Sequence, residues 1–140
     1  TGRDRFQGYL DALADSGLAR DGEIIVGREQ QTFENGYDAM KQLLQEKKAT
    51  ACFVAENPMA QGVFKCLMDY KKRIPEEMAM ICYDDFEWSQ LTVPTISAIR
   101  QPMKEMGRKA VELLLKKIGD PDAQCENIIL KSEFILRESC

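Results

Sequence analysis

The chain alternates between short apolar runs and longer stretches in which apolar residues recur every three or four positions. Short apolar runs bounded by turn residues predict buried strands, and the longer spacing predicts helices with one apolar face. The pattern predicts strands at 23–27, 50–55, 78–83 and 95–100, and helices around 6–13, 33–44, 59–70 and 102–119. Two further strand-like runs follow, "NIILK" (127–131) and "EFILR" (133–137).

This alternation indicates the fold class. Strands that are apolar along most of their length are buried on both faces, and intervening amphipathic helices provide the cover. We therefore expect an α/β fold in which a parallel sheet is flanked by helices on both faces.

Local signals place some helix ends. Ser16-Gly17-Leu18 has the form of a glycine C-cap followed by an apolar residue. Asn57 followed by Pro58 predicts an N-cap and a first helical residue.

The composition narrows the class of protein. A chain of 140 residues suits one domain, and no apolar run approaches the roughly 18 residues of a membrane span. The net charge is −4 and Lys and Arg are scattered, so this segment alone should not bind nucleic acid. No signal peptide opens the chain, which starts like a helix already under way, so we expect a fragment of a longer protein.

Cysteine and histidine usage gives two further constraints. Cys52, Cys66 and Cys82 occupy apolar positions, which favours buried reduced thiols and a cytoplasmic location. The chain has no histidine, which excludes Ser-His-Asp and Cys-His machinery and His-ligated zinc.

Polar residues gather where two predicted strands end. Glu56-Asn57 follows strand 50–55, and Asp84-Asp85 follows strand 78–83. In an open parallel sheet, ligands bind beyond the carboxyl ends of the strands. Asn57 and Asp85 suit caps of the following helices, which leaves Glu56 and Asp84 free to face a crevice.

Several uses remain open for these acids. As catalysts they lack a nearby nucleophile, and as metal ligands they lack the spacing of a calcium loop. A receiver-type site holding magnesium would need an isolated Asp and a Lys that cannot be placed here. Hydrogen bonding to a ligand is the simplest use left, so we expect no enzyme, no metal and no cofactor.

An ordered set of motifs then points to a family. The motifs are "RFQGYLDAL" (5–13), "TACFVAENPMAQG" (50–62), "IPEEMAMICYDD" (74–85), "VPTISAIRQPMKEMG" (93–107) and "ILRES" (135–139). Together they resemble the effector-binding domain of the lactose-repressor/galactose-repressor family of bacterial transcription regulators.

The resemblance implies a two-lobed, periplasmic-binding-protein-like (type I) fold that holds a small effector, such as a sugar, between its lobes. It also implies a homodimer that binds operator DNA only through an N-terminal domain absent from this chain. On this basis residues 1–94 are the C-terminal lobe, and 95–125 are a crossover segment and helix belonging to the missing N-terminal lobe. Residues 126–140 are then the returning C-terminal strands.

The resemblance also implies a site. Arg5 matches the family's ligand-binding arginine, and Asp84 the acid that accepts hydrogen bonds from the effector. Phe33 falls where a stacking aromatic often lies, and Met103 near the base of the pocket. Glu56 stands where the family has an effector-contacting Asn, which favours ligands rich in hydrogen-bond donors.

A second departure is Cys82, which replaces the usual Gly before Tyr-Asp. The function expected is sensing of a small polar effector, with no membrane partner. Two alternatives are a periplasmic sugar-binding protein of a transport system and a metal-dependent receiver-like or hydrolytic α/β domain.

Overall fold

A four-stranded sheet lies at the centre of the computed structural model, which describes residues 2–18, 25–46, 49–124 and 126–140. In chain order the elements are α1 (Gly2–Asp15), α2 (Phe33–Glu46), β1 (Ala51–Val54), α3 (Asn57–Asp69), β2 (Ala79–Tyr83), α4 (Trp88–Leu91), β3 (Ser97–Arg100), α5 (Met103–Gly119) and β4 (Glu133–Ile135). The strand order is β1-β2-β3-β4. The first three strands pair in parallel, as predicted, whereas β4 pairs antiparallel with β3.

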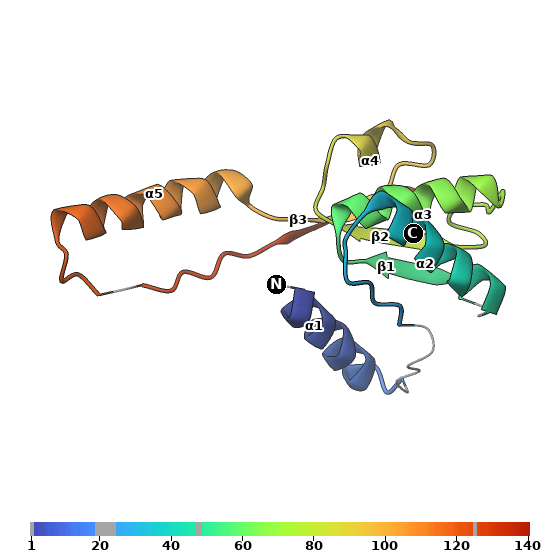
Figure 1. The fold of residues 1–140 in the computed structure, drawn as a ribbon, viewed down its shortest axis with the longest axis horizontal. Helices are drawn as coiled ribbons and strands as arrows, with labels where there is room; N and C mark the ends of the chain where they lie inside the picture. Colours follow the sequence, from blue (N-terminus) through green and yellow to red (C-terminus); the bar gives the residue numbers. More distant parts are fainter. Residues whose placement is uncertain (1, 19–24, 47–48, 125) are drawn as a thin grey trace.

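Two predicted strands do not form among the described residues. Residues 23–24 lie outside the described part of the chain, and residues 25–27 have no regular secondary structure. Residues 127–131 also run without a strand, and only 133–135 of the second run pair. An apolar run forms a strand only where a neighbouring strand offers a free edge to pair with. Residues 127–131 lie beyond the sheet (Figure 1) and have no such neighbour there among the described residues.

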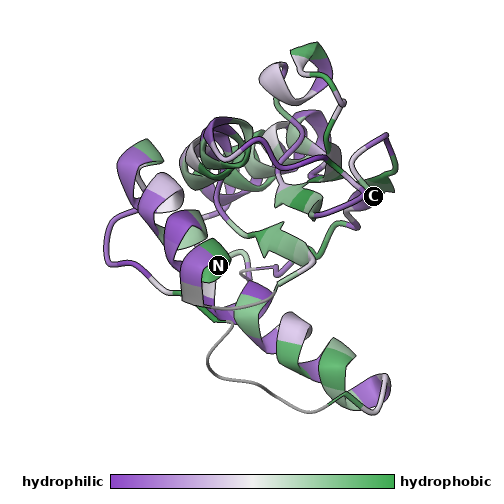
Figure 2. Ribbon diagram, turned by 90° about the vertical axis from the view of Figure 1, so that its right-hand side faces the viewer, coloured by the Kyte–Doolittle hydropathy of each residue, from purple (hydrophilic) through white to green (hydrophobic). Residues whose placement is uncertain are grey.

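The core lies between the sheet and the helices α2 and α3. The largest fully buried apolar side chains are Met40, Leu67, Met78, Met80 and Ile96. Figure 2 shows the strands at the centre in the hydrophobic colour, while the helices show both polar and apolar residues. The fully buried thiols of Cys66 and Cys82 belong to the same core and are not in disulfides, as predicted.

Two glycines allow α2 and α3 to pack closely. A Cβ atom on Gly36 would collide with the backbone of Met59, and one on Gly62 with the carbonyl oxygen of Phe33. The helices therefore touch backbone to backbone at this crossing. The contact holds the N-terminus of α3 against the start of α2, beside the carboxyl end of β1.

The helix α1 lies near the opposite face of the sheet. Side chains alternate along a strand, so Phe53 points away from the face that Val54 helps to bury. On that face the guanidinium of Arg5 in α1 lies 3.8 Å from the centre of the Tyr83 ring. The helix ends at Asp15 and is closed as predicted by Gly17, whose φ is 67°, while the amide of Leu18 donates to the carbonyl of Leu13.

The helix α5 extends away from the sheet as an arm, followed by the segment that leads back to β4 (Figure 1). None of its residues is buried. The large apolar side chains that it exposes are Met103, Met106, Val111, Leu114, Leu115 and Ile118. The sheet therefore leaves the apolar stripe of this helix, formed by these side chains, uncovered.

The returning end of the chain is fastened by one buried residue. The amide of Met80 in β2 donates to the carbonyl of Ser139, and the Ser139 hydroxyl donates to the carbonyl of Met80. The same hydroxyl accepts the amide of Ser97 in β3 at 2.8 Å. Ser139 therefore bridges two parallel strands through their backbones and is itself fully buried.

The glycine crossing yields a stability prediction. Gly62→Ala should lower the free energy of unfolding by about 1–3 kcal/mol, because backbone atoms must move to admit the methyl group. Gly8→Ala in α1 is the control, since its Cβ would meet no atom within 4 Å and alanine favours a helix by about 0.5–1 kcal/mol. Urea denaturation measures both. Equal stability of the two variants would contradict the crossing.

Candidate functional site

Arg5 is held in place by three partners at the carboxyl ends of β1 and β2. Its Nη1 donates to the carbonyl of Ala55 at 2.6 Å and to Oε1 of Glu56 at 2.9 Å. The flat guanidinium also stacks on the Tyr83 ring, where a cation is attracted by the π electrons. The Arg5 side chain is only 18% exposed, so its direction is largely fixed before any ligand arrives.

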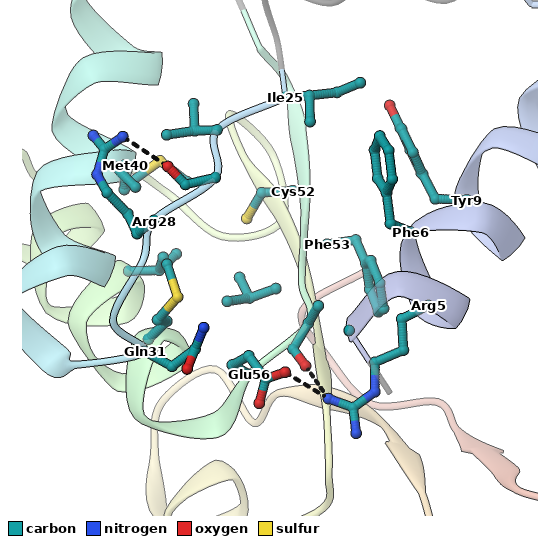
Figure 3. A pocket seen from close by; sticks show the side chains of 18 of the residues that line it. Arg5, Phe6, Tyr9, Ile25, Arg28, Gln31, Met40, Cys52, Phe53 and Glu56 are labelled. Atoms are coloured by element: carbon teal, nitrogen blue, oxygen red, sulfur yellow. Dashed lines mark hydrogen bonds and ion pairs between the residues drawn. The ribbon is translucent and has the colours of Figure 1, made fainter.

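A cavity of about 380 Å³ opens beside this pair (Figure 3). One wall comes from α1 through Arg5, Phe6 and Tyr9, and another from β1 through Cys52 and Phe53. The close-up shows the aromatic rings of Phe6 and Phe53 on the same side, with Glu56 turned toward Arg5. The lining of the cavity thus includes an apolar wall and one ion pair, in which the charges of Arg5 and Glu56 cancel.

Asp84 lies at the end of β2 in a left-handed backbone conformation, with a φ of 70°. Its amide donates to the carbonyl of Ile99 at 2.9 Å, and its Oδ1 accepts Nε2 of Gln101 at 2.5 Å. Since aspartate tolerates this conformation better than most residues, the turn is locally supported. The Asp84 carboxylate therefore faces the segment by which the chain leaves the sheet.

Asp85 has a different role from the helix cap that its position suggested. The N-cap of α4 is Glu87. The Asp85 carboxylate, only 1% exposed, instead forms ion pairs with Arg100 at 2.6 Å and Arg137 at 2.7 Å. Burial acts to raise the pKa of this carboxyl, but hydrogen bonds from Arg100, Arg137 and Ser89 outweigh it and hold the pKa below its ordinary value.

Asn57 does not cap α3 either. The N-cap position belongs to Glu56, and Asn57 is the first helical residue. Its Oδ1 accepts Nε1 of Trp88 at 2.7 Å, and the Trp88 ring lies 6.2 Å from that of Phe64. The indole N–H of the partly buried Trp88 thus has an acceptor in Asn57, and this bond joins α4 to α3.

The remaining two candidates are exposed. Phe33 begins α2, is 40% exposed, and is not among the described residues that line the cavity beside Arg5. Met103 begins α5 and is 66% exposed. It lines a second hollow, of about 560 Å³, together with Asp84.

The structure therefore brings the predicted residues together in two pairs. Arg5 contacts Glu56, and Asp84 shares a hollow with Met103. Tyr83 lies between the pairs, because it stacks under Arg5 and directly precedes Asp84. Sequence reasoning missed Tyr83, although its alternation with the buried Cys82 indicated the opposite face. It also missed Gln101, for which the local pattern gives no signal.

The chemistry available at these strand ends is recognition by hydrogen bonds. In the described part of the chain, no group of three or more Cys, Asp or Glu residues could hold a metal ion. Burial raises the pKa of the Cys52 thiol to about 12 and that of Cys82 to about 11. Both thiols are therefore protonated at neutral pH, and neither is a ready nucleophile.

The helices of the described residues give no candidate for a transmembrane segment, since none combines the required length with sufficient hydrophobicity.

Known proteins resemble the whole chain. The model of the periplasmic binding protein-like domain matches residues 1–140. The ribose operon repressor of Haemophilus influenzae is 33% identical over 98% of this chain and 41% of its own length. The transcriptional repressor PurR of the same organism is 33% identical over 99% of this chain and 42% of its own length. The chain thus spans about two fifths of the curated relatives it matches.

A solved structure agrees in shape as well. The transcriptional regulator CelR in complex with cellobiose superimposes with a TM-score of 0.90 at 29% identity. The match covers 99% of this chain and 42% of the CelR chain. The described fold, including the extended arm, is therefore one that known transcription regulators contain.

The ion pairs of Asp85 yield a pH prediction. Asp85→Asn should lower the free energy of unfolding by about 3–5 kcal/mol near neutral pH, since it leaves buried arginine charge uncompensated. Because the folded pKa is depressed, this contribution is full above the ordinary carboxyl pKa of 3.8 and is lost as pH falls through the folded pKa. The gap between wild type and variant in urea denaturation should therefore close in acid. The exposed pair of Glu77 with Arg73 is the control, and Glu77→Gln should cost far less because solvent screens it.

Proposed function

Because this chain belongs to the periplasmic binding protein-like domain family, as found in lactose-repressor/galactose-repressor transcription regulators, we propose that it senses a small polar effector for such a regulator. The observation that carries the proposal is the alignment of Arg5, Glu56 and Asp84 at the carboxyl ends of β1 and β2. These groups can orient a ligand by hydrogen bonds without any chemical step.

The wider architecture forms part of the proposal. Residues 1–94 act as one lobe of the sensor. Residues 95–125 first add β3 to the sheet of that lobe and then pass to a second lobe, to which α5 belongs. Residues 126–140 return to the first lobe. The exposed stripe of α5 supports this division, since burying each large apolar side chain gains about 1.5–3 kcal/mol. A homodimer in the cytoplasm would bind operator DNA through a separate domain.

The charges near the site indicate the class of effector. Glu56 neutralises Arg5, and the Asp84 carboxylate accepts hydrogen bonds only. Arg28 also lines the cavity beside Arg5, where it donates to the neutral oxygens of Gly27 and Gln42. A ligand therefore meets two carboxylates and two cations, one of them paired with Glu56, and this balance of charge favours neutral, hydroxyl-rich molecules. A sugar or sugar derivative fits. The sugars named for two similar proteins, ribose in an operon repressor and cellobiose in a regulator complex, agree with this class.

The proposal predicts a role for Asp84. In the complete protein, Asp84→Ala should weaken binding of the effector by about 1–3 kcal/mol, the loss expected for a hydrogen bond to a charged group. A thermal-shift screen of sugars, amino sugars, purines and sugar phosphates identifies the ligand, and titration calorimetry measures its affinity. Glu76→Ala, at an exposed carboxylate, is the control. Unchanged affinity in the Asp84 variant would refute the assignment.

Glu56 is predicted to set selectivity. Glu56→Gln removes the charge that neutralises Arg5, so affinity for sugar phosphates should rise relative to the unphosphorylated sugars, by about tenfold. The comparison uses calorimetry on paired ligands with the same sugar. Glu87→Gln, at an exposed carboxylate, controls for the change in net charge. A wild-type protein that already prefers the phosphorylated ligand would contradict the effector class.

A further inference from the structure

Asp85 joins three segments of the sheet at one point. It follows the end of β2, while Arg100 ends β3 and Arg137 comes shortly after β4. Arg100 donates to Oδ2 through Nε at 3.0 Å and Nη2 at 2.6 Å. Arg137 reaches the same carboxylate through Nη2, at 2.7 Å from Oδ1 and 2.8 Å from Oδ2. This buried carboxylate thus binds two arginines: Oδ2 contacts both, and Oδ1 contacts Arg137.

The two arginines mark the two places where the arm connects to the sheet. The chain leaves at Arg100, and α5 begins three residues later at Met103. It returns through β4, where Glu133 lies opposite Arg100 in the register and 3.8 Å from its Nη1. Figure 1 shows both connections meeting the sheet side by side while the arm extends away. One carboxylate therefore holds the outgoing and the returning connection.

Little else in the described residues fixes the arm to the sheet. No residue of α5 is buried, and its polar contacts are mostly within the arm, such as Arg108 with Glu112. Arg137 is anchored further, because its Nη1 donates to the carbonyl of Ile96 at 2.6 Å. The direction of the arm is therefore set where the connections meet Asp85.

We propose that Asp85 is the pivot residue of this hinge, positioning the arm relative to the sheet by holding Arg100 and Arg137 together. Arginine and carboxylate suit the task, since paired donors in a rigid fork fix an angle as well as a distance. Asp85 touches no proposed ligand group. Apart from the Ser89 hydroxyl, which donates to Oδ1 at 3.1 Å, its described side-chain partners are these two arginines.

The consequence for sensing rests on the proposed function. Asp84 and Asp85 are neighbours, and so are their partners Gln101 and Arg100. An effector that donates to Asp84 competes with Gln101 for the same carboxylate. Ligand binding would then rearrange the outgoing connection one residue away from the pivot. Asp85 would keep Arg100 and Arg137 together, so the arm would turn about this point while Gln101 moves.

Hydrogen–deuterium exchange of the complete protein without ligand tests the pivot. In Asp85→Asn, amides of 98–104 and 132–138 should exchange about tenfold faster, because both connections loosen locally. Amides of α3 should also exchange faster in Asp85→Asn, because loss of the buried ion pairs lowers the global stability. Variants of the two arginines separate the local effect from this global one. Glu77→Gln is the matched control, since it removes a carboxylate that is paired with arginine away from the hinge, and it should leave both segments unchanged.

Two further variants keep the test decisive if Asp85→Asn does not fold. Arg100→Gln should loosen 98–104 more than 132–138, and Arg137→Gln should do the reverse. Arg100→Lys should restore part of the protection, as expected if the charge acts through the carboxylate. Equal exchange in Arg100→Gln and Glu77→Gln would overturn the pivot. A uniform rise in Arg100→Gln across α3 and both segments would also overturn it, because the Arg100 side chain is 47% exposed and its loss should act locally.

The pivot and the sensing function can fail separately. The exchange experiment needs no ligand and decides the pivot alone. The same protein is then probed with D-ribose and with cellobiose. If neither these nor the other screened compounds bind, the sensing function is contradicted and the hinge result stands.

Discussion

Parallel pairing in register is the constraint on which the rest of this structure depends. Val54 pairs with Cys82, and Tyr83 with Ile99, so three strands end along one line. Polar residues lie at or within two positions of each strand end: Glu56 after β1, Asp84 and Asp85 after β2, and Arg100 with Gln101 at the end of β3. The recognition groups and the hinge groups therefore occupy neighbouring positions on the same edge.

Adjacent residues on this edge serve separate purposes because the backbone turns between them. The left-handed conformation of Asp84 directs its carboxylate toward Gln101, while Asp85 turns inward to two arginines. One acid remains accessible to a ligand, and its neighbour is buried and compensated. This division explains how two consecutive aspartates can follow a buried strand without leaving two like charges together.

The sequence predicted the parts of the fold that depend on local pattern. The strand ends and the glycine end of α1 follow from spacing and from turn residues, whereas the separation of α5 from the sheet was expected only from the family resemblance. The predicted N-caps at Asn57 and Asp85 were wrong because each side chain binds a partner that is distant in the sequence. Asn57 is used by Trp88, which lies 31 residues away, and Asp85 by Arg137, which lies 52 residues away. Local propensity carries no information about such partners. The position of Asp84 was predictable from the strand-end rule, whereas its contact with Gln101 needed the course of β3.

The hydrogen bonds of Ser139 to β2 and β3 also constrain the order in which the domain can fold during synthesis. Ser139 and Met80 are bonded across 59 residues of sequence, and the whole arm lies between them. A ribosome must therefore synthesise α5 and the returning segment before the notch between β2 and β3 can be filled. Until then this notch, and the outer edge of β3 that pairs with β4, stay open to solvent and to other chains. Domains with such late closure are exposed to mispairing during synthesis, and an arm that leaves and returns within one stretch of chain keeps that interval short.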